Sequence, residues 1–92
     1  MPYIINKKRV IVKPSLDILS DIFEELNEKE ELTAGDLNYI FTSLIKSYVH
    51  TKGKSYQSFN DVIGALEGCK LELYRREVGP YEDVKKAING DY

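Results

Sequence analysis

Residues 58–78 carry apolar or small side chains on two sides of a predicted helix, and no other feature constrains the fold as much. Steps of about 100° per residue gather one apolar set within about 60° of Leu66. The set comprises Phe59, Val62, Ile63, Cys69 and Leu73. Gly64 and Gly68 lie on the opposite side, one turn apart, and Leu71, Tyr74 and Val78 lie between the two sides. A helix of this kind needs two packing partners.

The two glycines predict a close contact. Glycine in an exposed helix interior costs about 0.8–1 kcal/mol relative to alanine, so its presence indicates that a backbone or a ligand comes near. A chain with few further helices favours a second subunit as the source, and the fourth helix or the N-terminal arm of the same chain is the alternative. We therefore expect a homo-oligomer whose interface includes Gly64, Gly68, Leu71 and Val78.

The remaining segments predict an all-α fold, a small bundle of three main helices plus a short C-terminal helix. Apolar side chains recur at helical spacing over residues 15–29 and 36–51, and Pro80 opens a short helix that ends at Asn89-Gly90. Residues 1–13 have a β-branched run between basic side chains, which favours an extended N-terminal arm. A chain of 92 residues has room for one core, so residues 14–92 form a single helical domain.

Local signals mark where these helices begin and end. Thr33 and Asp36 are capping candidates for the second helix, and Gly53 suits a left-handed position after its last turn. Ser58 and Asp61 read as a capping box for the third helix. The run Val78-Gly79-Pro80 predicts a break before the fourth.

Charge and composition argue against several classes of protein. Fifteen acidic and 13 basic side chains give a net charge of −2, so the chain has no overall positive field for nucleic acid. The basic arm could contact phosphate, but the acidic first helix would repel the same backbone. A single cysteine excludes an internal disulfide or a cysteine metal cage. No apolar run approaches the roughly 18 residues of a membrane span and no leader is apparent, so we expect a cytoplasmic protein.

The sequence contains few signs of a catalytic site. We therefore expect that the protein is not an enzyme and binds no cofactor or metal. His50, the one histidine, reads as a surface residue near a helix end, and Cys69 reads as a small apolar residue. No nucleophile stands beside a base, and no phosphate loop or calcium loop occurs. A site shared between subunits stays open.

Cationic and aromatic side chains in the C-terminal third predict a ligand site. Arginine suits carboxylate or phosphate, and tyrosine offers a stacking surface. Lys70 lies within the apolar side of its helix, so it either extends its ammonium to a carboxylate such as Glu67 or Glu77 or points into a polar pocket. The same cluster could equally be a salt-bridged interface. The candidate ligand-binding residues are Asn38, Lys70, Tyr74, Arg75, Arg76, Tyr81 and Asn89.

The chain contains six short motifs: MPYI at 1–4, GDLNY at 35–39, VIGALE at 62–67, KLELYRR at 70–76, PYED at 80–83 and NGD at 89–91. Together they resemble a family of small proteins of unknown function found in bacteriophages and bacteria. The resemblance covers nearly the whole chain after residue 35. The chain departs from the family pattern at Gly68-Cys69, where that pattern has Cys-Ala, and it lacks one residue before Tyr92.

The resemblance implies a viral or virus-like origin, in the cytoplasm of the host cell, and supplies no activity. Small phage proteins of this size commonly act by binding, and the step from there to this chain is an analogy. We therefore expect a homo-oligomer that binds an anionic small molecule, such as a nucleotide immune signal that it sequesters. The alternative is an interaction module that occupies a host or phage protein and has no small-molecule ligand.

Overall fold

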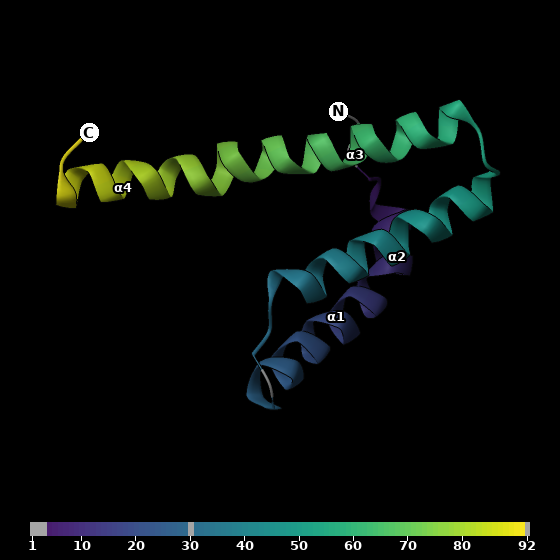
Figure 1. Ribbon diagram of the computed structural model, residues 1–92, viewed down its shortest axis with the longest axis horizontal. Coiled ribbons are helices and arrows are strands. Elements are labelled where there is room, and N and C mark those ends of the chain that lie inside the picture. The colour runs from purple at the N-terminus through teal and green to yellow at the C-terminus, as the bar shows by residue number, and fades with distance from the viewer. Residues whose placement is uncertain (1–3, 30, 92) are drawn as a thin grey trace. The chain divides into compact units, whose positions relative to one another are not determined.

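The computed structural model describes residues 4–29 and 31–91, and these residues form helices without a strand (Figure 1). The elements are α1 (Asn6–Lys29), α2 (Ala34–Lys52), α3 (Tyr56–Leu73), the π-helical turn η1 (Tyr74–Val78) and α4 (Gly79–Asn89). The all-α prediction is confirmed. The chain divides into two units, Met1–Ser43 and Leu44–Tyr92, and the boundary lies inside α2.

Helix α1 corrects the prediction of an extended N-terminal arm. It begins at Asn6, where the Ile5 carbonyl accepts hydrogen bonds from the backbone N–H groups of Lys8 (3.0 Å) and Arg9 (3.1 Å). The β-branched run costs the helix only a few tenths of a kcal/mol per residue. The helix also continues through Pro14, although proline cannot donate to the preceding turn. Residues 1–3 of the predicted arm lie outside the described residues.

The predicted caps of α2 are confirmed. The backbone N–H of Thr33 donates to Asp36 Oδ2 (3.0 Å), and the Asp36 N–H donates back to Thr33 Oγ1 (3.4 Å). At the other end Gly53 has a φ of +95°, a backbone conformation that side chains disfavour. Both ends of α2 are therefore fixed by local chemistry that can be read from the sequence.

The cap of α3 lies one turn earlier than predicted. Ser55 is the N-cap residue, and its side chain and that of Ser58 each accept a hydrogen bond of 3.1 Å from the other's backbone N–H. Ser58 Oγ also donates to the Gly53 carbonyl (2.8 Å) and is buried. Ser58 thus belongs to the first turn of the helix, and Asp61 is left for other contacts.

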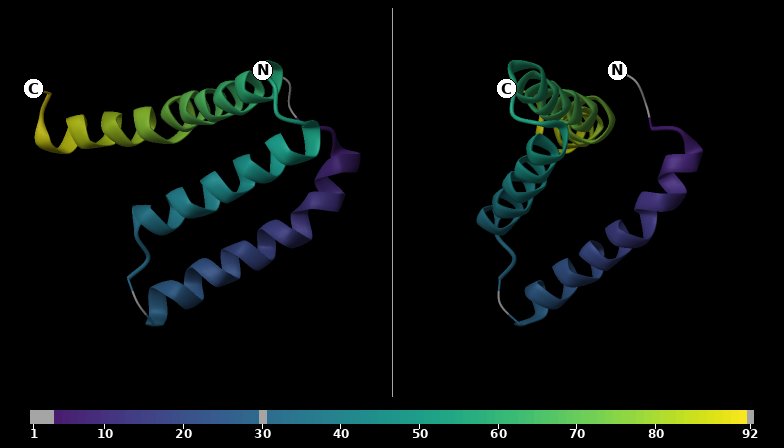
Figure 2. Two further views of the ribbon diagram at one scale, coloured as in Figure 1. Left: turned by 45° about the vertical axis from the view of Figure 1, so that its right-hand side comes forward. Right: turned by 90° about the vertical axis from the view of Figure 1, so that its right-hand side faces the viewer.

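The predicted break at Val78-Gly79-Pro80 is a π turn instead. The Gly79 N–H reaches back to the Tyr74 carbonyl, so the helix widens before Pro80, which has no N–H to offer. A Cβ at Gly79 would lie 3.1 Å from the same carbonyl oxygen, which explains the glycine. As a result α3, η1 and α4 form one continuous helical run, and α4 ends at Gly90 (φ +89°) as predicted (Figure 2).

Neither unit has a hydrophobic interior among its described residues. No apolar side chain is buried, and Ser58 is the one buried residue in that part of the chain. Each unit alone therefore has the amphipathic helices of a bundle without a bundle's core. None of the described helices combines the length and apolar character of a membrane span.

Candidate functional site

Glu72, on the last turn of α3, is the centre of the predicted cationic cluster. Its Oε1 accepts from Arg75 Nη2 at 2.6 Å, and its Oε2 lies 2.8 Å from Arg76 Nε. The pairing with Arg76 is the one that the sequence spacing favours. The guanidinium of Arg75, a predicted ligand-binding residue, contacts the same carboxylate. One carboxylate therefore holds both arginines.

Lys70 is paired within its own helix. Its Nζ lies 3.8 Å from Glu67 Oε1, and both side chains are exposed. Of the two interpretations open at this position, the extended lysine with a carboxylate partner is the one that the structure shows.

The remaining ligand candidates are distributed over three places. Tyr74 and Tyr81 are exposed, and the Lys85 ammonium lies 5.5 Å from the centroid of the Tyr81 ring, a cation–π distance. Asn89 lines an open polar hollow at the end of α4 with Lys85, Lys86 and acidic neighbours. Asn38 belongs to α2 in the first unit. Within the second unit, the structure therefore groups Arg75 and Arg76 at Glu72, and Asn89 lines a different hollow.

The glycine side of α3 stays open. A Cβ at Gly64 would meet nothing within 4 Å, Gly68 is half-exposed, and Leu71 is 59% exposed. Val78, in η1, is half-buried. Within the second unit, α4 therefore does not fill this side at Gly64.

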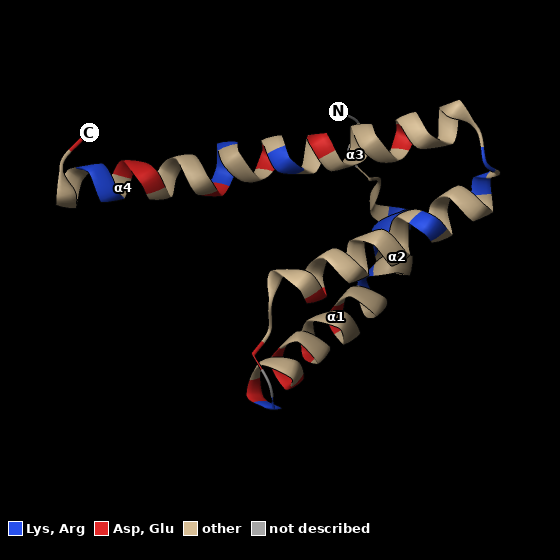
Figure 3. Ribbon diagram, viewed as in Figure 1, with Lys and Arg blue, Asp and Glu red and all other residues tan. Residues whose placement is uncertain are grey.

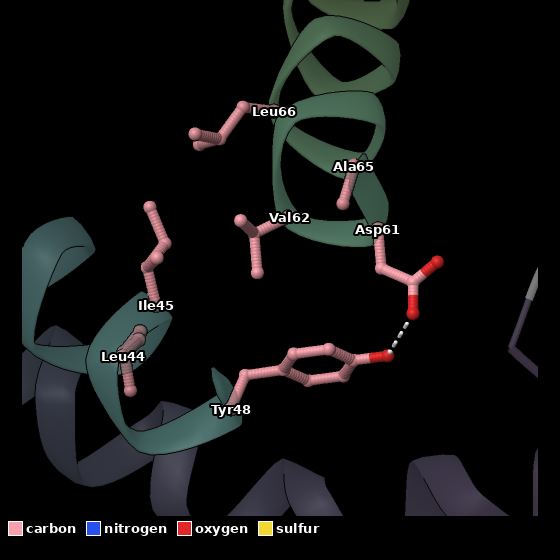
Figure 4. Close-up of a pocket in the computed structure, with 7 residues that line it drawn as sticks. All are labelled: Leu44, Ile45, Tyr48, Asp61, Val62, Ala65 and Leu66. Atoms are coloured by element: carbon pink, nitrogen blue, oxygen red, sulfur yellow. Dashed lines mark hydrogen bonds between the residues drawn. The ribbon is translucent and has the colours of Figure 1, made fainter. Parts of the chain in front are cut away.

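An apolar groove between the second half of α2 and α3 is a feature that the sequence did not reveal (Figure 4). It has a volume of about 290 Å³. Tyr48 and Asp61 close one side through a hydrogen bond of 3.1 Å, and Asp61 also accepts from Gln57 Nε2 at 2.7 Å. The lining residues are Leu44, Ile45, Tyr48, Asp61, Val62, Ala65 and Leu66.

The hydrogen bond to Asp61 raises the pKa of Tyr48, and partial desolvation and the carboxylate's negative charge act in the same direction. The phenol is therefore kept neutral as a donor. Apart from this pair the groove offers aliphatic surface, which suits an apolar side chain from a helix more than an anion. The apolar side chains at helical spacing over residues 37–48 were a sequence signal for this groove. Their spacing could not show that the Tyr48 hydroxyl forms a hydrogen bond with Asp61.

The described residues contain no group of three or more histidine, cysteine, aspartate and glutamate side chains that could hold a metal ion. His50 lines a second open hollow beside Phe59 in the same unit. No apolar side chain is buried among the described residues, and Cys69, interpreted from the sequence as a small apolar residue, is exposed as well.

The fold and these surfaces define a small all-α protein whose recognisable features are unfilled apolar faces and short-range ion pairs. The chain belongs to the domain family of unknown function DUF6899, whose model matches residues 1–92. This agrees with the expected family of unknown function. No curated protein and no solved structure matches the chain.

Proposed function

We propose that this chain is a homo-oligomeric binding protein whose copies complete one another's hydrophobic core. The observation that supports the proposal is that neither unit buries a large apolar side chain among the described residues. Full burial of one leucine, isoleucine, valine or phenylalanine contributes about 1.5–3 kcal/mol. Ordering each residue's backbone costs about 1–2 kcal/mol, so helices without such burial are marginal in water.

Two surfaces of the second unit are suited to this assembly. One is the glycine side of α3, where Gly64 leaves space for a close backbone and Leu71 is exposed. The other is the α2–α3 groove around Val62 and Leu66. Both are apolar and continuous with helical surface, as the interfaces of small helical oligomers are.

Light scattering over a range of concentrations tests the assembly. The expected mass is a multiple of the 10.6 kDa chain that falls on dilution. Gly68→Leu should lower the mass, and Gly35→Leu on α2 is the matched control that adds the same side chain elsewhere. A particle of 10.6 kDa at every concentration, with cooperative unfolding, would refute the proposal.

A nucleotide or other anionic small molecule is the ligand that we propose for such an assembly. In its favour, the guanidinium groups of Arg75 and Arg76 converge on Glu72, a position that a phosphate could take if Glu72 turned away. A virus-like setting in the host cytoplasm, against a host defence, belongs to this proposal and rests on analogy alone. The alternative is an interaction module for a host or phage protein.

A thermal-shift screen with nucleotides separates the two. A ligand at a hundredfold excess over its Kd stabilises the folded state by about 2.7 kcal/mol, whereas an interaction module shows no shift. Arg75→Ala should abolish the shift, and Glu72→Gln should increase it, because the competing carboxylate charge is removed. A shift that survives Arg75→Ala would remove these arginines from the site.

A further inference from the structure

Helix α1 has opposite charges at its two ends. Because it begins at Asn6, the four basic residues of the supposed arm share one helix with the acidic residues that follow (Figure 3). Residues 6–13 carry Lys7, Lys8, Arg9 and Lys13 and no acid. Residues 17–28 carry Asp17, Asp21, Glu24, Glu25 and Glu28 and no base.

One face of α1, here called the isoleucine face, consists of Ile11, Ser15, Ile18 and Ile22. Steps of about 100° per residue place these four side chains within about 60° of one another. Ile11 is 71% exposed and Ile18 is 60% exposed. The half-buried Leu19 and Phe23 lie about a quarter turn further round, so the isoleucine face is a second and uncovered apolar side.

The spacing of this face continues into the charged ends. Lys8, Ser15 and Ile22 follow at intervals of seven, and so do Ile11, Ile18 and Glu25. Together they form the alternating three- and four-residue pattern by which two helices pack side by side. This row of six side chains, here called the seam, begins at Lys8 and ends at Glu25.

We propose that α1 of one copy packs antiparallel against α1 of a second copy through the isoleucine face. The register pairs residues whose numbers add to 33, so Ile11 faces Ile22 and Ser15 faces Ile18 of the second copy. At both ends of the seam Lys8 then faces Glu25. Lys7 and Glu28 occupy the flanking positions beside this layer, where they also meet with opposite charge.

The charges select this direction. In a parallel pair Lys7 and Lys8 would face their own copies, and Glu25 and Glu28 would do the same, which is repulsive at both ends. Within the helix Lys29 Nζ contacts Glu25 Oε1 at 2.7 Å. A carboxylate has a second oxygen, so Glu25 can accept from Lys8 of the other copy as well.

This inference rests on the proposed assembly and assigns it a further contact, in the first unit. A two-fold contact through α1 is self-complementary and uses none of the surface around Gly64 or the α2–α3 groove. If the two self-contacts join different copies, the assembly is larger than a dimer.

Charge reversal tests the register. Lys7→Glu with Lys8→Glu, and Glu25→Lys with Glu28→Lys, should each raise the dissociation constant by about tenfold or more, because attractive pairs at both ends become repulsive. An equimolar mixture of the two variants should assemble again. The chain with all four substitutions should do so as well, since the two ends have merely exchanged charge.

Controls of equal charge separate this effect from net charge. Lys85→Glu with Lys86→Glu, and Glu82→Lys with Asp83→Lys, make the same changes on α4 and should leave the dissociation constant near the parent value. If the parent assembles and the α1 variants match these controls, the α1 pairing is wrong and the proposed function stands. A parent that is monomeric throughout overturns both.

Cross-linking tests the direction. In a Cys69→Ser background, Lys8→Cys and Glu25→Cys should form a disulfide-linked dimer when the two variants are mixed. Either variant alone should form little. Efficient cross-linking of each variant with itself would show a parallel pair and overturn the proposal.

Discussion

The Tyr48 hydroxyl donates a hydrogen bond of 3.1 Å to Asp61 Oδ2, across thirteen positions of sequence. This bond joins the second half of α2 to α3 beside the apolar groove that both helices line (Figure 4). Asp61 is oriented in turn by Gln57, one turn earlier on α3. Hydrogen bonds among Tyr48, Asp61 and Gln57 therefore fix one side of the groove, although the rest of its lining is aliphatic.

The Tyr48–Asp61 pair predicts a pH dependence. The pKa of Tyr48 is raised in the folded chain, so the neutral phenol is the favoured form. The resulting stability is fully present below the ordinary tyrosine pKa of about 10 and is lost as the pH rises through the higher folded value. Absorbance titration of the parent and of Tyr48→Phe should show that the tyrosine removed by the substitution ionises above the ordinary value of about 10, and Tyr56→Phe serves as the exposed control. Equal titration midpoints would contradict the pairing.

Ser58→Ala should destabilise the chain by about 1–2 kcal/mol. The substitution removes the bond to the Gly53 carbonyl and half of the reciprocal cap with Ser55, at a buried position. Urea unfolding followed by circular dichroism measures the change. Ser20→Ala, on an exposed position of α1, should change the unfolding free energy by less than about 0.5 kcal/mol. Equal effects of the two substitutions would show that the cap contributes nothing.

Gly79→Ala should lack the usual benefit of alanine in a helix. Replacing an exposed helical glycine commonly stabilises by about 0.8–1 kcal/mol, but here the new Cβ would lie 3.1 Å from the Tyr74 carbonyl oxygen. At Gly35 the nearest contact would be an ordinary 3.5 Å to Thr33 Oγ1, so Gly35→Ala is the matched comparison. Thermal unfolding should rank Gly35→Ala above Gly79→Ala. The reverse order would mean that the π turn does not constrain residue 79.

Glu72→Gln should lower stability by only about 0.5–1 kcal/mol. The carboxylate binds two arginines, but both guanidinium groups are exposed and solvent screens such pairs. Glu67→Gln, which removes a longer contact of 3.8 Å to Lys70, should have a smaller effect. Urea unfolding at low and at 1 M salt checks both, since the Glu72 effect should shrink as salt rises. An effect that is independent of salt would exclude a charge-based role for Glu72.

The sequence was sufficient for the features that depend on neighbouring residues. Chemistry within a few positions accounts for the all-α class, the caps at Thr33 and Asp36, the left-handed Gly53 and the end of the last helix at Asn89-Gly90. The same local reasoning failed where residues further along the chain determine the secondary structure. Residues 6–13 look extended alone, yet they join a helix that continues through Pro14.

The candidate site was predicted only in part. The Glu72–Arg76 pair follows from helical spacing, but the second pairing, to Arg75, was not foreseen beside the π turn that follows Leu73. The α2–α3 groove could not be predicted, since it depends on how two helices meet after the turn at Gly53. Lys70 had two open interpretations, and its distance to Glu67 decides between them.

No hydrophobic interior is present among the described residues of either unit, so the survival of the polypeptide depends on its concentration. If copies supply the missing contacts, mass action makes the melting temperature rise with protein concentration. At low expression the unassembled helices would unfold often and be cleaved by cellular proteases. Rapid synthesis would raise the concentration, favour assembly and so protect the helices. Such a protein would accumulate steeply above a threshold dose and disappear quickly below it.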